Sequence, residues 1–318
     1  MFSLNRTVKI IFSAEVMNDY SYLDNLENKS IYIIREAYYQ YRDRLAVLWS
    51  IGKDSTSMVH LIRKAFFGQV PIPVIHLDTS YKFKEIYQFR EHYARQWGLK
   101  LLVARNEEAL KQGMAPEKGR LECCTALKTE TLKQVIKKYN LKALLLAIRR
   151  DEHAIRAKER YFSPRDANFQ WDYQNQPPEL WEQYNRPASR EADAGRPNQS
   201  GVGTSPVFSG ERAGQDQTNG AEEVHFRIHP MLGWREIDIW RYIKRENLPV
   251  VELYFSKNGQ RYRSIGCETC CQPVPSDAET IDDIIKELET TKTAERSGRA
   301  QDKEQAYMMQ KLRSLGYM

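Results

Sequence analysis

The stretch Leu45-Ala-Val-Leu-Trp-Ser-Ile-Gly-Lys-Asp-Ser55 joins a short apolar run directly to a turn of small and charged residues. A continuous apolar run of five residues is typical of a strand that is buried on both faces of a parallel sheet. Asp54 and Ser55 are residue types that cap helix N-termini, and a helical pattern of apolar residues follows them. We therefore predict a strand, a tight turn and a helix, in this order.

Similar apolar runs alternate with helical stretches through the first half of the chain. Besides the strand at 45–49, the predicted strands are 74–78, 101–104 and 143–148. Besides the helix after Ser55, the predicted helices are 31–45, 82–97 and 124–138. Strands that alternate with helices of this length favour βαβ units. The predicted fold class is therefore α/β, a doubly wound parallel sheet flanked by helices, with a mostly helical C-terminal region.

Composition divides the chain into four parts. Residues 185–223 are rich in Gly, Ser, Asn, Gln and Pro and nearly free of large apolar side chains. Such a segment cannot bury enough surface to offset the entropy of ordering, so we expect a flexible polar insertion there. An N-terminal extension at 1–30 and a core at 31–184 precede it. A C-terminal region at 224–318 follows it and contains a last helical stretch at 279–313.

The turn after the first predicted strand has the residues of an anion site. It would present free backbone N–H groups and the positive end of a helix dipole. Gly52 lets the backbone approach a phosphate, Lys53 adds a positive charge, and the hydroxyls of Ser50 and Ser55 add donors. The spacing is not that of a Walker A motif. A plain strand-to-helix turn capped by Asp54 and Ser55 is the alternative interpretation.

The segment at 50–55 resembles the pyrophosphate loop of the adenine nucleotide alpha-hydrolase superfamily, which includes the PAPS reductases. Further segments follow in order along nearly the whole chain. Together they resemble the family of the small, nucleotide-binding subunit of bacterial sulfate adenylyltransferase. These segments are 76–82, 149–152, 156–160, 171–172, 178–181, 227–234, 238–240, 295–299 and 316–317.

The resemblance implies cleavage of ATP between its α and β phosphates, with sulfate as the acceptor and adenylyl sulfate and pyrophosphate as products. It also implies Mg²⁺ as a cofactor and a GTPase large subunit as a partner. The residues that it places at ATP and pyrophosphate are Ser50, Ile51, Gly52, Lys53, Asp54, Ser55 and Asp78. Those that it places at the substrate oxyanion are Arg149, Arg150, Arg156 and Arg160, with Lys53, Arg149 and Arg150 as the catalytic residues.

The residue types at two of these positions allow other interpretations. Planar, bidentate arginines suit a tetrahedral oxyanion, but Arg149 and Arg150 stand beside two acidic residues and could instead form a surface ion-pair cluster. Asp78 could position the nucleotide or Mg²⁺, or simply end a strand. His76, inside the same predicted strand, is interpreted as a core histidine.

The five cysteines form two tight clusters, and this pattern departs from better-known members of the small-subunit family. Cys123 and Cys124, followed later by Cys267 and Cys270, resemble the ligand pattern of the iron–sulfur adenylyl-sulfate reductases. Four thiolates suit a [4Fe–4S] cluster. They could also bind zinc, or bind no metal at all. Cys271 is left over as an alternative ligand or a small buried residue.

Length and charge limit the location of the chain and its partners. The chain has 318 residues and a net charge of +6, and no run approaches eighteen consecutive apolar residues. The N-terminus lacks a clean small-residue cleavage site, so we expect a cytoplasmic protein without a membrane span. The positive charge suits a nucleotide-binding enzyme and a nucleic-acid-binding protein equally well.

Three alternative functions follow from the same residues. An iron–sulfur ATP pyrophosphatase could activate an acceptor for sulfur insertion, as in DNA phosphorothioation or tRNA thiolation, and would have a nucleic acid partner. A reductase is disfavoured because its chemistry needs a further mobile cysteine near the C-terminus, and no cysteine follows Cys271. A non-catalytic nucleotide sensor is disfavoured by the intact Gly52, Lys53 and Ser55.

Overall fold

The computed structural model describes residues 14–172 and 225–299, together with 176, 178–179, 184, 311–312 and 314–316. The described helices are α1 Ala14–Tyr41, α2 Lys53–Ala65, α3 Lys84–Gln96, α4 Glu107–Lys111, α5 Arg120–Cys124, α6 Thr131–Lys138, α7 Glu236–Glu246 and α8 Ile281–Thr290. The described strands are β1 Leu45–Leu48, β2 Val74–Leu77, β3 Leu101–Ala104, β4 Ala143–Leu145, β5 Phe162–Arg165, β6 His225–Ile228, β7 Gln260–Arg261 and β8 Val274–Pro275. The predicted insertion at 185–223 lies outside the described residues.

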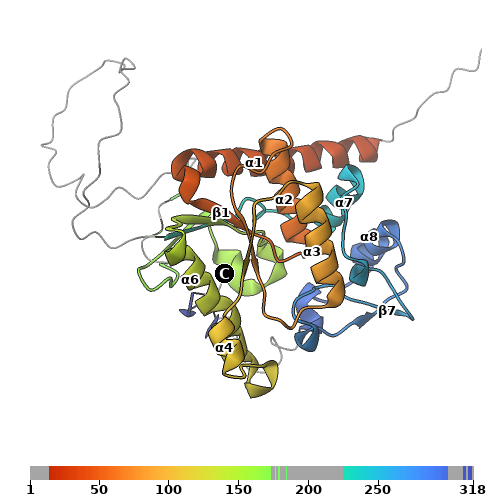
Figure 1. The fold of residues 1–318 in the computed structure, drawn as a ribbon. Coiled ribbons are helices and arrows are strands. Elements are labelled where there is room, and N and C mark those ends of the chain that lie inside the picture. Colours follow the sequence, from red (N-terminus) through yellow and green to blue (C-terminus); the bar gives the residue numbers. More distant parts are fainter. Residues whose placement is uncertain are drawn as a thin grey trace, which may run out of the picture.

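A six-stranded sheet with the order β3-β2-β1-β4-β6-β5 forms the centre of the molecule (Figure 1). The first five strands in this order are parallel, and β5 pairs antiparallel with β6 at the edge. The chain runs from β1 outward to β3 and then returns to place β4 on the other side of β1. The carboxyl ends of β1 and β4 therefore form a topological switch point, where α/β folds bind ligands.

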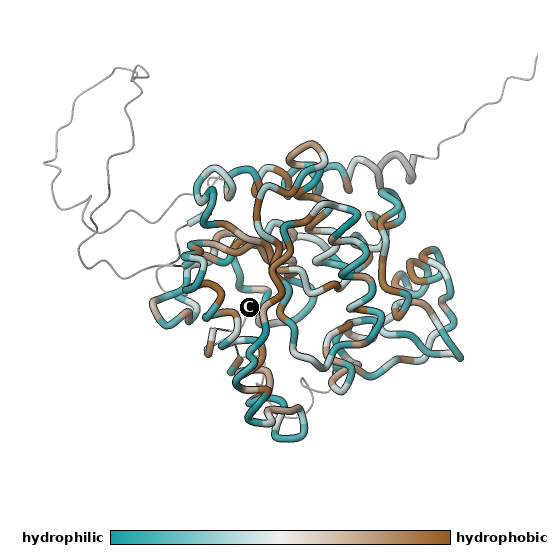
Figure 2. The backbone as a smooth tube through the Cα atoms, viewed as in Figure 1, coloured by the Kyte–Doolittle hydropathy of each residue, from teal (hydrophilic) through white to brown (hydrophobic). Residues whose placement is uncertain are grey.

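Alternate residues of the central strands face two separate apolar cores, so the molecule has three layers. Leu45 and Val47 of β1 pack with side chains of α1, α2, α3 and α7. Ala46 and Leu48 point the other way and pack with side chains of α6. Figure 2 shows the central strands as the hydrophobic middle of the molecule, with hydrophilic segments around it. The predicted α/β sheet flanked by helices is confirmed.

Several elements differ from the predicted ones. The helix predicted at 31–45 is the end of a longer helix, α1, which crosses the boundary that we predicted at residue 31. Strand β6 belongs to the same sheet as the predicted core, although it lies in the predicted C-terminal region. The division into four parts remains a prediction. The stretch predicted as helical at 279–313 contains α8 and the 3-10 turn Glu295–Gly298 with non-helical residues between them.

The helix predicted at 124–138 is interrupted by a change of helix type. Between α5 and α6 the chain forms a π-helical segment, η3 Thr125–Glu130. π-helical turns are rare and often lie at functional sites. Here the segment follows Cys123 and Cys124 directly and carries Lys128. Among the residues that the structure describes, no helix is both long and apolar enough to cross a membrane.

Candidate active site

The predicted phosphate loop connects the end of β1 to the start of α2, at the switch point of the sheet. Ile51 has a φ of 70° and is buried, so the turn holds a β-branched residue in the left-handed region. Such a conformation is a genuine outlier that neighbouring structure must stabilise. Gly52 has an ordinary φ of −74°, and a Cβ there would make only ordinary contacts at 3.4 Å. The backbone strain of the loop therefore lies at Ile51.

The loop donors converge on one side of the turn. The Oγ atoms of Ser50 and Ser55 lie 3.0 Å apart. The backbone N–H of Lys53, at the start of α2, donates to the hydroxyl of Tyr254 at 2.9 Å. Tyr254 is buried and comes from a segment 201 residues further along the chain, so the C-terminal region closes over the loop.

Lys53 and Arg149 share a buried cage of carboxylates. Glu295 accepts hydrogen bonds from Lys53 Nζ and from Arg149 Nη2. Asp54 lies 3.4 Å from Lys53 Nζ and 2.6 Å from Arg149 Nε. Glu236 lies 4.0 Å from Lys53 Nζ, and Arg149 also pairs with Asp151. Both cations are thus fixed by carboxylates before any substrate is present.

These contacts determine the charge states in the cage. Burial alone would lower the pKa of Lys53, but Asp54, Glu295 and Glu236 outweigh it and raise this pKa well above its usual value. Burial alone would raise the pKa of Glu295, but Arg149 and Lys53 hold it well below its usual range. Both groups are therefore charged at neutral pH.

A cavity opens beside the loop, between the ends of β1, β2 and β4 and the C-terminal region. It encloses about 1060 Å³ of empty space when its open mouth is included. Its lining contains six cationic side chains, Lys53, Lys82, Lys128, Arg156, Arg296 and Arg299, and three carboxylates, Asp54, Glu152 and Glu295. This excess of positive charge suits a ligand with several negative charges.

The structure brings only part of the predicted site residues to this cavity. Of the predicted phosphate loop, the lining contains Ser50, Gly52, Lys53, Asp54 and Ser55, but not Ile51. Of the four predicted arginines, it contains Arg156 alone. The Nη1 atoms of Arg156 and Arg296 both contact Glu152, which leaves this group with one net positive charge.

Arg149, Arg150 and Arg160 are not among the lining residues. Arg149 is fully buried in the carboxylate cage. Arg150 is exposed; it donates to the backbone oxygen of Glu159 at 3.2 Å, and its guanidinium lies 5.4 Å from the ring centroid of Tyr161. Of these four arginines, only Arg156 therefore lines the cavity, and their predicted role at the oxyanion stays a prediction.

Asp78 and His76 have separate surroundings. The Asp78 carboxylate accepts from Ser80 N at 2.8 Å, Tyr87 Oη at 3.0 Å and Arg105 Nη2 at 3.2 Å, and it does not line the cavity. Burial would raise the pKa of Asp78, but these donors lower it. The prediction of a core histidine is confirmed, because His76 is fully buried and its Nδ1 lies 2.9 Å from the oxygen of Trp49.

The two cysteine clusters, both buried, lie close together beside the cavity. Lys128 Nζ is 3.6 Å from Cys124 Sγ, and the same ammonium acts electrostatically on Cys267. Burial, followed by the thiols of Cys124, Cys267 and Cys270, raises the pKa of Cys123 to about 12. Burial would raise the pKa of Cys267 as well, but Lys128 and nearby cations lower it to about 7.

These thiols are not arranged as a finished metal centre. Among the described residues, no three Cys, His, Asp or Glu side chains are placed to hold one metal ion. All five cysteines are free thiols. Cys271 accepts hydrogen bonds from Gly266 N and from Arg299 Nη1, both at 3.0 Å, and so links its cluster to the cavity wall.

Several lining residues were not named as site residues in the sequence analysis. Lys82 follows β2 at the carboxyl edge of the sheet, so its position was a usable signal. Lys128 lies four residues after Cys124 and faces the same place through the π-helical segment. Glu295 lies in the segment 295–299 that carries the family resemblance, but nothing local predicted its contact with Lys53. Tyr254 had no such signal, since only the tertiary fold brings it to the loop.

Solved structures show the same fold. The crystal structure of Candida glabrata FMN adenylyltransferase in complex with FAD and inorganic pyrophosphate superposes with a TM-score of 0.51 at 15% identity, covering 80% of this chain and 66% of that chain. The same enzyme in complex with ATP gives a TM-score of 0.50 at 15% identity, covering 80% and 64%. At this identity the likeness shows the fold alone.

Sequence comparisons show the family. The Phosphoadenosine phosphosulfate reductase domain matches residues 44–273. Sulfate adenylyltransferase subunit 2 of Baumannia cicadellinicola is 37% identical, covering 93% of this chain and 98% of the relative. The same subunit of Hahella chejuensis is 36% identical, covering 95% and 100%. The chain therefore belongs to the sulfate adenylyltransferase subunit 2 family and carries a phosphoadenosine phosphosulfate reductase domain.

Proposed function

We propose that this chain is an adenylyltransferase that converts ATP and sulfate into adenylyl sulfate and pyrophosphate. The observation that carries the proposal is the loop at 50–55, which opens into a cavity with excess positive charge at the switch point of the sheet. Relatives that match nearly the whole chain are named for this activity. ATP and sulfate are both polyanions, as such a cavity requires.

In this proposal the loop binds the β and γ phosphates. The N-terminus of α2 and the hydroxyls of Ser50 and Ser55 supply donors, and Lys53 supplies charge from a fixed position. Sulfate is already ionised, so the reaction needs charge neutralisation and in-line placement rather than a general base. Arg149 acts through the cage, by holding Asp54 and Glu295 against Lys53.

Mg²⁺ would enter with ATP and neutralise part of the phosphate charge. The carboxylates that line the cavity are Asp54, Glu152 and Glu295, and each is already paired with a cationic side chain. Asp78, the predicted Mg²⁺ residue, is occupied by Arg105 and lies outside the lining. We therefore assign no protein ligand to the ion.

We also propose that Cys123, Cys124, Cys267 and Cys270 hold a [4Fe–4S] cluster. Four buried thiols from two segments are the donor set that such a cluster takes, and Lys128 and Lys82 would balance its negative charge. The described thiols are not yet closed around one centre, so binding requires them to move together. No step of the proposed reaction passes through the cluster.

We also propose a partner and a location for this chain. The relatives are named subunit 2, and we propose a large subunit that couples GTP hydrolysis to this uphill reaction. We propose the cytoplasm as the location, because five free, buried cysteines suit a reducing compartment.

A second candidate function rests on the thiols beside the cavity. An ATP pyrophosphatase that activates a nucleic acid for sulfur insertion would need both the phosphate loop and the cysteine clusters. It would release pyrophosphate from ATP in response to DNA or tRNA with a sulfur donor rather than in response to sulfate.

The experiment is a pyrophosphate-release assay on anaerobically purified protein, with inorganic pyrophosphatase added to draw the reaction forward. We expect release that requires sulfate and adenylyl sulfate as the product. The variant Lys53→Met should abolish it. Because this change leaves Glu295 without one buried partner, the double variant Lys53→Met/Glu295→Gln serves as the matched control. It should regain stability but not activity. Normal turnover in either variant would refute the role of the loop.

A further inference from the structure

Tyr254 connects the C-terminal region to the first backbone N–H of α2. It ends the 3-10 turn η7 Glu252–Tyr254, and its side chain is 1% exposed. Its hydroxyl accepts a hydrogen bond from the backbone N–H of Lys53 at 2.9 Å. This N–H belongs to the group that a helix N-terminus leaves without an intrahelical partner. A side chain from a segment 201 residues away therefore caps the start of the phosphate-loop helix.

The hydroxyl of Tyr254 has a donor left over. A phenol can accept one hydrogen bond and donate another at the same time. Because Lys53 N–H is the donor in the contact above, the O–H hydrogen of Tyr254 is directed elsewhere. Among the residues that the structure describes, no group accepts it. A buried donor without an acceptor is costly, so we expect the cavity that Tyr254 lines to receive an acceptor for it.

The hydroxyl lies close to the donors of the loop itself. A Cβ on Gly52 would lie 3.4 Å from Tyr254 Oη and 3.5 Å from Ser50 Oγ. Ser50 Oγ is in turn 3.0 Å from Ser55 Oγ. Three hydroxyls are therefore grouped beside a glycine at the helix N-terminus, and all three residues line the cavity. Several donors at one helix N-terminus are the environment that phosphate oxygens favour.

The ring of Tyr254 is fixed before a ligand binds. Trp240 packs against it edge-on, with the ring centroids 5.4 Å apart, and Lys53 Nζ lies 5.6 Å from the Tyr254 centroid. Burial, opposed by the charge of Lys53, raises the pKa of Tyr254 to about 12. The hydroxyl is therefore protonated at neutral pH and able to donate. A donor that is already in place lowers the entropic cost of binding.

We propose that Tyr254 is a binding residue of the phosphate loop, and that its hydroxyl donates a hydrogen bond to a β or γ phosphate oxygen of ATP and to the pyrophosphate product. The inference rests on the proposed function, because it takes the loop to hold these phosphates. It adds a donor from the C-terminal region, so the loop is complete only when that region is folded against it. Lys53 N–H, the Tyr254 hydroxyl and the phosphate would form one chain of hydrogen bonds, in which each bond strengthens the next.

The test is Tyr254→Phe, which removes the hydroxyl and keeps the ring. Tyr242→Phe is the matched control, because Tyr242 is an equally buried tyrosine on α7 that does not line the cavity. Binding of inorganic pyrophosphate and of AMP is measured separately by calorimetry, without sulfate. Loss of a hydrogen bond to a charged group should weaken the binding of pyrophosphate to Tyr254→Phe about tenfold or more. The binding of AMP, which has no β and γ phosphates, should change less than about twofold.

A second pair of measurements separates binding from a merely structural role. If the hydroxyl only caps α2, Tyr254→Phe should lower the urea midpoint of the free protein and affect both ligands alike. Tyr242→Phe shows what the loss of a buried hydroxyl does elsewhere in the fold. In the pyrophosphate-release assay, Tyr254→Phe should raise the KM for ATP about tenfold and change the KM for sulfate less than about twofold.

The outcomes distinguish this inference from the proposed reaction. An unchanged affinity of Tyr254→Phe for pyrophosphate, or an equal loss for pyrophosphate and AMP, would overturn the inference. Tighter binding of pyrophosphate would also overturn it, because the hydroxyl would then occupy the position of a phosphate oxygen. A wild type that binds no pyrophosphate would overturn both the inference and the role of the loop. If the wild type makes no adenylyl sulfate but Tyr254→Phe still weakens pyrophosphate binding alone, the proposed reaction fails and the role of Tyr254 stands.

Discussion

Replacing Glu295 by Gln tests the carboxylate cage that fixes the phosphate loop. Glu295 contacts both Lys53 Nζ and Arg149 Nη2 at hydrogen-bond distance. Asp54 lies 3.4 Å from Lys53 Nζ and contacts Arg149 at Nε instead. The side chains of Lys53 and Arg149 are 1% and 0% exposed. Removing one partner of a buried ion pair costs about 3–5 kcal/mol. Because Asp54 remains near both cations, we expect a loss at the lower end, about 3 kcal/mol.

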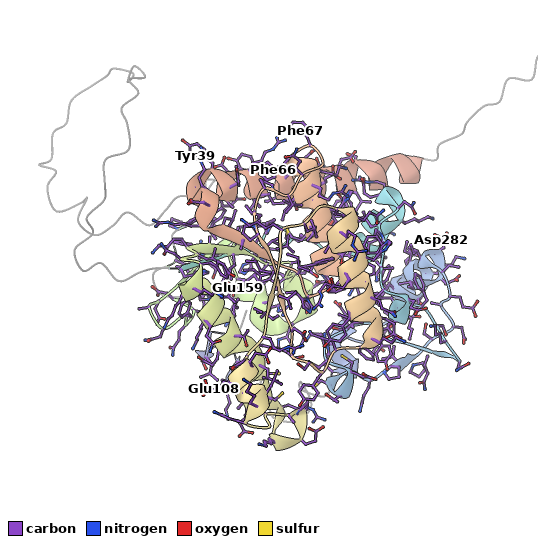
Figure 3. The ribbon with its side chains drawn as sticks, in the orientation of Figure 1. Tyr39, Phe66, Phe67, Glu108, Glu159 and Asp282 are labelled. Carbon is purple, nitrogen blue, oxygen red and sulfur yellow. The ribbon has the colours of Figure 1, made fainter. Side chains whose placement is uncertain are left out.

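The assay is urea unfolding at pH 7, where this loss should move the midpoint by about 1 M. The control is Glu108→Gln on α4, an exposed carboxylate labelled in Figure 3, which should change stability by less than about 0.5 kcal/mol. A double-mutant cycle with Lys53→Met should give a coupling energy above about 1 kcal/mol, since the two side chains are in contact.

The effect of Glu295→Gln should also depend on pH. The folded protein holds the pKa of Glu295 below its usual value. Its stabilisation is therefore present above the unfolded pKa of about 4.3 and is lost as the pH falls below that value. The gap between wild type and variant should be full at pH 7 and shrink in acid. If Glu295→Gln lowers the free energy of unfolding by less than about 0.5 kcal/mol at pH 7, Glu295 does not stabilise the two buried cations as argued. A difference between wild type and variant that stays the same in acid would contradict the argument as well.

Three further predictions concern other parts of the molecule. Burial lowers the pKa of His76 to about 3, so its contribution to stability is present above about 6.5 and falls by about 2 kcal/mol between pH 7 and pH 5. His76→Gln should flatten this part of the pH dependence of the urea midpoint, and an unchanged slope would contradict the assignment. Gly266→Ala should displace the Arg299 guanidinium from its hydrogen bonds to Ser264, Ile265 and Cys271 and lower the urea midpoint, because a Cβ at residue 266 would fall 1.9 Å from Nη1; an unchanged midpoint would contradict this packing. Cys123→Ser and Cys270→Ser should each lower the iron content and the absorbance near ~400 nm of anaerobically purified protein, whereas a colourless wild type would remove the cluster.

The sequence was sufficient for the parts of this site that are local. The strand, turn and helix predicted from the apolar run at 45–49 and the polar turn after it all occur in the structure. Both faces of β1 are buried, and α2 begins within the turn. The four predicted parallel strands all occur, although the strands predicted at 45–49, 74–78 and 143–148 each end earlier in the structure. Strand β5 was missed, since its pairing with β6 is long-range.

The parts that depend on distant contacts could not be predicted in the same way. Arg149 follows a strand and seemed placed for an anion, but Asp54 and Glu295 enclose it from segments 95 and 146 residues away. Lys82 and Arg299 meet beside the cysteines only because the C-terminal segment folds back along the cavity. A local sequence pattern cannot predict this contact between distant segments.

The most direct test of the account is pyrophosphate release from ATP by the anaerobically purified chain, measured with and without sulfate and with the product identified. The account predicts release that requires sulfate and yields adenylyl sulfate. Pyrophosphate release that does not depend on sulfate, but increases with DNA or tRNA and a sulfur donor, would contradict the account and assign the chain to sulfur insertion.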